Sequence, residues 1–345
     1  MANYDYRSDT ITKPTEKMRR AMYEAEVGDD VYGEDPTVKK LERLACDISG
    51  KEAAMFVPSG TMGNQIAVKV HTNPSDEILL EENCHIHWYE GGGIGAISGV
   101  QSKLIKSNNG VMNIEDIRKG IRPDDIHFPK TTLLCLENTN NKCGGTVTGL
   151  EAMSEIYKLA VDNNIKVHLD GARIFNAAIY LGVEAKLIME HCDSVMFCLS
   201  KGLCAPVGSI LAGEEDFIKD ARKTRKMLGG GMRQSGVIAS AGIIALKEMT
   251  GRLAEDHENA RALGEGLKNI RGLDVNIDTV QTNIVMCDIV KENLNSLKLK
   301  EAMAQSNVFS TYITDKRLRF VLHYHITKND VLETLNIIEK IMDDL

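Results

Sequence analysis

The sequence predicts an α/β protein with a large domain, built on a mainly parallel sheet flanked by helices, and a smaller α+β C-terminal domain. One observation is the pair of apolar runs at 167–169 and 194–199, which enclose a segment of helical periodicity at 174–188. A strand–helix–strand unit of this kind makes its two strands parallel neighbours in one sheet. The other observation is a change of pattern after Leu273, where a separate set of strands and helices begins.

Length and composition set the broad class. The chain has 345 residues, more than one domain usually holds, so we expect an N-terminal arm at 1–15, a large domain at 16–250 and a small domain at 251–345.

The net charge is −8 without a basic block, which argues against a nucleic-acid partner. The eight cysteines form no C-x-x-C pair, which is typical of reduced thiols in a cytoplasmic protein. The sequence has neither a signal-like N-terminus nor an apolar stretch that could cross a membrane, so we expect no membrane association.

The individual elements follow from caps, breakers and apolar periodicity. A helix should begin at Pro36 and stop at Gly50, because Asp35 is a favoured N-cap and proline suits the first helical position. Strands are predicted at 53–57, 77–81, 103–105, 132–136, 209–212, 282–290, 308–313 and 318–323. Further helices are predicted at 114–121, 150–164, 219–226, 237–246, 252–270, 297–305 and 330–343.

A turn of small residues, Pro58-Ser59-Gly60-Thr61, leads directly into a helix that ends near His71. Free backbone N–H groups and the positive end of the helix dipole meet at such a start, so it suits a phosphate group. Gly60 allows a close backbone approach and Thr61 adds a hydroxyl. No Gly-Lys-Ser/Thr follows, so this is not a Walker A loop, and the same residues also suit a plain tight connection.

Two chemically useful side chains follow the two strands of the central unit. Asp170 ends the first strand and Lys201 follows the second, and open α/β sheets bind their ligands at this carboxyl edge. Pyridoxal phosphate needs a lysine amine for its Schiff base and an acid beside its ring nitrogen. The pair therefore fits that cofactor, although Asp170 could also be a helix cap and Lys201 a solvated loop lysine.

Two histidines, His85 and His87, follow the strand at 77–81. They could be metal ligands, but no third ligand lies at a recognisable spacing, so we predict no metal site. A histidine or aromatic side chain packed over a flat cofactor ring is the favoured interpretation.

Taken in order, four of these features resemble the pyridoxal-phosphate enzymes of fold type I, the aspartate aminotransferase fold. They are the phosphate turn, His85, Leu-Asp-Gly-Ala-Arg at 169–173 and Leu-Ser-Lys-Gly at 199–202. The resemblance implies a large domain with a mainly parallel sheet and a smaller C-terminal domain.

Three further runs narrow the resemblance to the L-threonine aldolases of the low-specificity or L-allo type. They are Arg-Ser-Asp-Thr at 7–10, Gly-Asp-Asp-Val-Tyr-Gly-Glu-Asp-Pro at 28–36 and Gly-Gly-Gly-Met-Arg-Gln at 229–234. The resemblance covers essentially the whole chain. It implies a lyase of amino-acid metabolism and glycine biosynthesis, which reversibly cleaves L-threonine and L-allo-threonine to glycine and acetaldehyde.

The resemblance also implies roles for single residues. Lys201 would form the Schiff base, Asp170 would hold the ring nitrogen, and His85 would stack on the ring and be the candidate base. The other implied cofactor contacts are Gly60, Thr61, Arg173, Ser200 and, from a neighbouring subunit, Arg233. The implied substrate contacts are Ser8, Tyr89, His127, Arg173 and Arg319.

The position of Arg233 implies a homo-oligomer, a dimer or a dimer of dimers (a homotetramer), with shared active sites. Two departures from the family pattern could shift substrate preference. Asn140 stands where relatives commonly carry histidine, and His323-Tyr324-His325 replaces the commoner Thr-His pairing.

Other functions stay open at this point. One is a different fold-type-I enzyme, such as a β-eliminating lyase or an aminotransferase, although no residues mark the second carboxylate site that an aminotransferase usually has. Another is a non-catalytic scaffold that kept the fold, which the combination of Asp170, Lys201 and Arg319 argues against. The sequence does not fix the preference between threonine isomers, the base for the β-hydroxyl proton or an ion near Thr10.

Overall fold

The computed structural model describes residues 3–345, which divide into two compact units. The larger unit comprises residues 13–143 and 147–250. The smaller unit comprises the described residues up to Thr12, the short segment 144–146 and residues 251–345.

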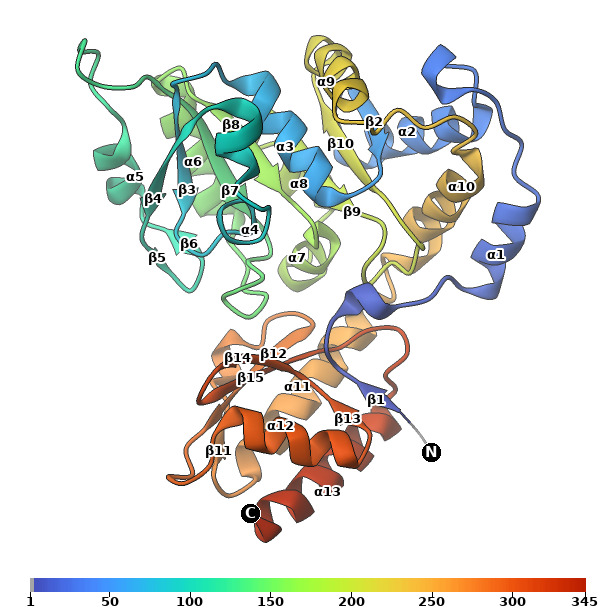
Figure 1. Ribbon diagram of the computed structural model, residues 1–345, viewed down its shortest axis with the longest axis vertical. Helices are drawn as coiled ribbons and strands as arrows, with labels where there is room; N and C mark the ends of the chain where they lie inside the picture. The colour runs from blue at the N-terminus through green and yellow to red at the C-terminus, as the bar shows by residue number, and fades with distance from the viewer. Residues whose placement is uncertain (1–2) are drawn as a thin grey trace. The chain divides into compact units, whose positions relative to one another are not determined.

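The larger unit is built on a seven-stranded sheet with the strand order β2-β10-β9-β8-β7-β3-β4 (Figure 1). The strands are β2 (Ala53–Val57), β3 (Glu77–Glu81), β4 (Gln101–Ile105), β7 (Thr131–Glu137), β8 (Lys166–Asp170), β9 (Ser194–Cys198) and β10 (Ser209–Gly213). Only β10 runs antiparallel to its neighbours in this sheet. The mainly parallel sheet, with β8 and β9 as parallel neighbours, confirms the predicted fold class.

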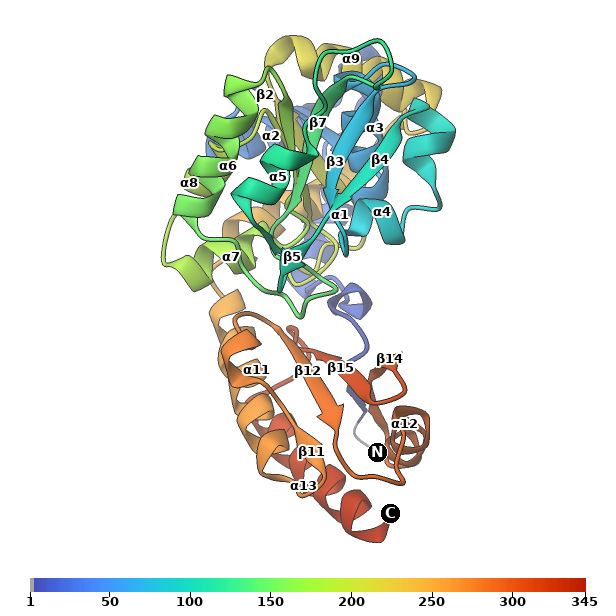
Figure 2. The same cartoon turned by 90° about the vertical axis from the view of Figure 1, so that its left-hand side faces the viewer.

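Helices cover both faces of this sheet, and β3, β9 and β10 are buried along their whole length. Figure 2 shows α5, α6 and α8 on one side of the sheet and α3 and α4 on the other. The helices of this unit are α1 (Glu16–Tyr23), α2 (Pro36–Ser49), α3 (Gly60–His71), α4 (His85–Trp88), α5 (Ile114–Gly120), α6 (Leu150–Asp162), α7 (Ile174–Leu181), α8 (Ala185–Met189), α9 (Glu215–Met227) and α10 (Gly236–Ile244). A short hairpin pairs β5 (Ser107–Asn108) with β6 (Val111–Met112).

Two predicted elements are each divided in the structure, and one helix was not predicted. The segment 174–188 forms two helices, because Gly182 takes a positive φ of 66° and caps α7 in the left-handed conformation. The strand predicted at 308–313 is two strands, β13 (Val308–Phe309) and β14 (Thr311–Thr314). Helix α1 was not predicted at all; the side chain of Thr15 caps it by accepting a hydrogen bond from Met18 N.

The smaller unit contains a four-stranded antiparallel sheet with the order β11-β12-β15-β14, packed with three helices. Its remaining elements are β11 (Leu273–Asp274), β12 (Ile284–Ile289), β15 (Arg317–Val321), α11 (Leu253–Asn269), α12 (Ser296–Gln305) and α13 (Lys328–Asp344). The chain's first described strand, β1 (Tyr4–Asp5), pairs in parallel with β13. Tyr6 then packs edge-on against Phe320 at 5.8 Å in the core of this unit.

Among residues 3–345, no helix combines the length and the apolar character that a membrane-spanning helix requires. All eight cysteines are free thiols, and six of them are buried.

Candidate active site

One cavity of the larger unit collects most of the predicted site residues. It lies where β8 and β9 end and α3 begins, and its lining includes Gly60, Thr61, His85, Asp170, Arg173, Ser200 and Lys201. These seven residues come from four separate parts of the chain. The carboxyl edge of the sheet therefore brings them together, as the α/β pattern predicts.

The phosphate turn forms the first wall of the cavity. Ser59 caps α3, because its Oγ accepts a hydrogen bond from Met62 N at 3.1 Å. An added Cβ at Gly60 would lie 3.0 Å from Cys198 Sγ, so this position has no room for a side chain. The first N–H groups of a helix have no partner within the helix, and here they belong to cavity-lining residues.

Asp170 is held rigidly at the end of β8. It is 2% exposed. Its Oδ1 accepts a hydrogen bond from Ala172 N at 3.0 Å, and its Oδ2 accepts one from Asn64 Nδ2 at 2.8 Å. Two donors on one buried carboxylate fix its orientation.

His85 begins the short helix α4, with its ring tied to a buried acid. Its Nδ1 lies 2.9 Å from Glu90 Oε1, and the ring centroid of Tyr89 is 5.5 Å away. Burial disfavours the imidazolium, but the hydrogen bond to Glu90 and the negative charges of Asp170, Glu90 and Glu137 outweigh it and raise the pKa of His85. More of the His85 side chain is therefore protonated near neutral pH than in a free histidine.

Glu137 lines the cavity from the carboxyl end of β7, where the sequence places a polar group without indicating a role for it. Its carboxyl accepts hydrogen bonds from His85 N at 2.6 Å and Asn141 N at 2.8 Å, so it joins two loops of the cavity wall. Burial and the charge of Asp170 raise the pKa of Glu137 to about 7, although both backbone donors oppose the shift. The cavity thus contains a carboxyl group that titrates near neutral pH.

Asn64 and Glu90 were also missed, and they connect Asp170 to His85. Asn64 Nδ2 donates to Asp170 Oδ2 and also, at 2.7 Å, to Glu90 Oε1. The available signals were indirect: Asn64 lies one turn into the helix that the phosphate turn starts, and Glu90 directly precedes three glycines. His85, Glu90 and Asp170 bring potential ligand atoms within 4.8 Å of one another, but these hydrogen bonds already account for the grouping, and we assign no metal to it.

The loop that carries Lys201 connects β9 to the antiparallel strand β10. Cys198 at the end of β9 pairs with Ser209 at the start of β10, so both ends of the loop are anchored. Within the loop, Leu199 N donates to Gly208 O at 3.0 Å. Cys204 N donates to Lys201 O at 2.9 Å, which fixes the backbone of Lys201 itself.

Arg173 also lines the cavity, and its Nη1 donates to Asn141 Oδ1 at 3.2 Å.

Three predicted residues of the larger unit are not among those that line the cavity. Tyr89 is exposed beside His85, and His127 is an exposed residue whose Nδ1 lies 2.7 Å from Asp125 Oδ1. Arg233 is ion-paired with Asp29 at 2.8 Å, and 56% of its side chain is exposed.

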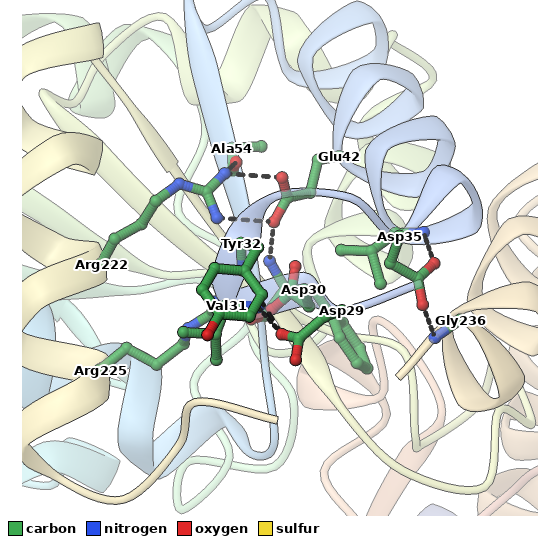
Figure 3. Close-up of polar contacts among 12 residues, drawn as sticks. Asp29, Asp30, Val31, Tyr32, Asp35, Glu42, Ala54, Arg222, Arg225 and Gly236 are labelled. Carbon is green, nitrogen blue, oxygen red and sulfur yellow. Dashed lines mark hydrogen bonds and ion pairs between the residues drawn. The ribbon is translucent and has the colours of Figure 1, made fainter. Parts of the chain in front are cut away.

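The segment 28–36 is fastened to the larger unit by several carboxylates (Figure 3). Asp30 forms a buried ion pair with Arg225 at 2.8 Å. Asp35 caps α2 through Thr37 N and Val38 N, and its other oxygen accepts a hydrogen bond from Gly236 N at 2.9 Å. This segment and the start of α10 therefore hold each other in place.

The two predicted substrate residues Ser8 and Arg319 belong to the smaller unit. Ser8 Oγ accepts a hydrogen bond from Thr10 N at 3.2 Å. Arg319 Nη2 donates to Arg7 O at 3.4 Å. The guanidinium thus lies against the segment that carries Ser8.

Comparison with known proteins gives consistent results. The model of the beta-eliminating lyase family matches residues 5–290. The chain is 44% identical to "Low-specificity L-threonine aldolase 1" of Arabidopsis thaliana, across 99% of this chain and 97% of the relative. It is 42% identical to the "Low specificity L-threonine aldolase" of Escherichia coli, across 95% and 96%. Among solved structures, a threonine aldolase of Leishmania major aligns with a TM-score of 0.84 at 18% identity, across 98% of this chain and 99% of that one, and so supports the fold.

Proposed function

The chain belongs to the beta-eliminating lyase family and, within it, to the L-threonine aldolases, and from this premise we propose how its residues cleave β-hydroxy-α-amino acids. It is a pyridoxal-phosphate-dependent lyase that converts L-threonine and L-allo-threonine reversibly to glycine and acetaldehyde. The observation that carries the site proposal is the cavity in which Lys201, Asp170 and the phosphate turn at Gly60 meet.

The residues present fit the cofactor. A buried carboxylate suits a protonated ring nitrogen, a lysine supplies an amine, and a glycine-containing helix start suits a phosphate. When bound, pyridoxal phosphate supplies an electron-poor ring that accepts the electron pair of the breaking Cα–Cβ bond. Asp170 would keep a proton on the ring nitrogen, Lys201 would provide the amine, and Gly60, Thr61 and Ser200 would hold the phosphate.

The substrate is held by other groups of the chain. Arg319 and Ser8 bind its carboxylate and so select which bond at Cα breaks, a task for which a planar guanidinium is suited. Arg173 lies near the cofactor and the substrate, while Tyr89 and His127 form the rim. A base, His85 or a water molecule that it holds, takes the β-hydroxyl proton as the aldehyde leaves, and Cα then gains a proton to give glycine.

The direct test is an assay of the purified protein with L-threonine and L-allo-threonine, in which acetaldehyde and glycine are both measured. Equal amounts of the two products support the aldol cleavage. Formation of 2-oxobutanoate with ammonia would instead indicate β-elimination, and the absence of both reactions with cofactor bound would indicate a scaffold.

The function of His85 can be tested by the change His85→Phe, which keeps a flat ring but removes both nitrogens. If His85 takes part in proton transfer, the cofactor should still bind while kcat falls by about 10²–10⁴-fold. The loss should differ between L-threonine and L-allo-threonine, because their β-hydroxyl groups point to different sides. A small and equal loss for both substrates would restrict His85 to stacking and make His127 or a bound water the next candidate.

The proposed carboxylate contact predicts a specific loss in Arg319→Lys. This variant keeps the positive charge but loses the planar fork, so kcat/KM should fall by an amount equivalent to about 2–4 kcal/mol of transition-state binding. Arg317→Lys is a matched control in the same strand, since Arg317 pairs with Asp288 at 2.6 Å on the surface. An unchanged kcat/KM in Arg319→Lys would remove this residue from substrate binding.

The assembly and the cellular setting are further parts of the proposal. A homo-oligomer, a dimer or a homotetramer, would let Arg233 reach the cofactor phosphate of a neighbouring subunit, and its exposure leaves it accessible to such a partner. Sedimentation of the purified protein measures the state directly. The product glycine and the free thiols agree with a cytoplasmic enzyme of glycine biosynthesis, which cell fractionation can check.

A further inference from the structure

A continuous chain of hydrogen bonds runs behind the cavity, from the periphery of the larger unit to Asp170. His71 Nε2 lies 2.8 Å from Ser194 Oγ, and the same oxygen lies 2.9 Å from His168 Nδ1. His168 Nε2 lies 3.1 Å from Asn64 Oδ1. Asn64 Nδ2 then donates to Asp170 at 2.8 Å.

All three inner members of this chain are completely buried: Ser194, His168 and Asn64 each have 0% exposure. A buried polar network is stable only if each donor faces an acceptor. The direction of each bond can therefore be worked out from its neighbours.

The amide of Asn64 fixes the direction at the inner end. Both hydrogens of Nδ2 are used, because Nδ2 faces one oxygen of Asp170 and one of Glu90. Its Oδ1 can only accept, so the facing Nε2 of His168 must carry a proton. An amide turned the other way would place its oxygen against two carboxylates.

The outer end of the chain follows in the same way. Burial, together with His71, lowers the pKa of His168 to about 3, so the ring is neutral and its Nδ1 is an acceptor. Ser194 donates its hydroxyl proton to that nitrogen and accepts a hydrogen bond from His71 Nε2–H. The ring of His71 is itself held by stacking on Phe217 at 4.5 Å.

We propose that His168 is a positioning residue for the cleavage reaction. By donating from Nε2 to Asn64, it sets the direction of that amide, so that both amide N–H bonds point at Asp170 and Glu90. This arrangement orients the carboxylate of Asp170, which would face the cofactor's ring nitrogen, and through Glu90 it reaches His85. The inference rests on the proposed function. The protonation of His168 at Nε2, which the inference requires, does not depend on that function.

Two variants separate this role from simple filling of space. Glutamine places its amide nitrogen near the position of the imidazole Nε2, so His168→Gln can still donate to Asn64. Asparagine reaches only the position of Nδ1, so His168→Asn leaves Asn64 Oδ1 without its donor. We expect His168→Gln to retain cofactor affinity and kcat within about threefold, and His168→Asn to lose about ten- to a hundredfold in both.

The controls are His191→Gln and His191→Asn. His191 is a half-buried histidine of the same unit, and its ring contacts Tyr157 instead of any member of the hydrogen-bond network. Both should behave like the unchanged protein. Equal losses in the two His168 variants would overturn the proposal, because lost packing would then explain them.

A second measurement does not depend on activity. With ¹⁵N-labelled histidine, His168→Gln identifies the signals of His168 by their disappearance, and the unchanged protein should show a protonated Nε2 and an unprotonated Nδ1 from pH 6 to 8. An Nδ1–H tautomer would overturn the proposal even if the aldolase reaction is observed. If His168 shows the expected tautomer but the protein is inactive, the proposed function would be wrong and the tautomer assignment would stand.

Discussion

Replacing Lys201 by alanine should lower kcat for threonine cleavage by about 10⁴-fold or more, because the cofactor loses the amine that anchors it and exchanges with the substrate. The variant should still fold, since the carbonyl of residue 201 keeps its hydrogen bond from Cys204 N in the alanine variant. Acetaldehyde release measures the activity. Borohydride reduction of the unchanged holoenzyme, followed by peptide mapping, should place the label on Lys201.

Lys219→Ala is a suitable control, because Lys219 is an exposed lysine of α9 outside the cavity. It should leave activity and labelling unchanged. A borohydride label on any lysine other than Lys201 would contradict the assignment, whatever the activity of the alanine variant.

Replacing Asp170 by asparagine should be the next most damaging change, lowering kcat by about 10²–10⁴-fold. This loss in kcat corresponds to about 3–5 kcal/mol, which is the cost of removing one partner of a buried charge pair. The visible absorption spectrum of the bound cofactor should change as well, because its ring nitrogen loses the acid that keeps it protonated. Steady-state kinetics and the spectrum of the holoenzyme measure the two effects separately.

This substitution also tests the alternative that Asp170 merely caps the following turn. Asparagine accepts a backbone hydrogen bond about as well as aspartate does, so the contact with Ala172 N would survive in the variant. A purely structural Asp170 therefore predicts almost full activity for Asp170→Asn, and that result would refute its assignment to the ring nitrogen.

Much of the fold could be predicted because the signals were local. Short apolar runs such as 53–57 and 77–81 match β2 and β3 residue for residue, and Asp35 with Pro36 marks the start of α2. Turns inside a periodic segment were harder. Gly182 interrupts a helical pattern that is apolar on both sides, so the pattern alone does not show that the chain breaks there.

The antiparallel direction of β10 was not predicted, because strand direction depends on the path of the connecting loop. The candidate site shows the same limit. Asp170 and Lys201 were accessible to prediction because Asp170 is the last residue of its strand and Lys201 follows the end of the next strand by three residues. Asn64, Glu90 and Glu137 act through hydrogen bonds between distant segments, and no spacing in the sequence records such a contact.

The double anchoring of the Lys201 loop has a consequence for the end of each reaction cycle. Because the loop is anchored at both ends to paired strands, the Lys201 side chain stays beside the cavity. Its effective concentration there is at least in the millimolar range that short flexible tethers give. Free amino acids must arrive by diffusion and compete at their actual concentration. The lysine amine should therefore displace glycine before a second free amine can, which lets the enzyme release its product even where glycine accumulates.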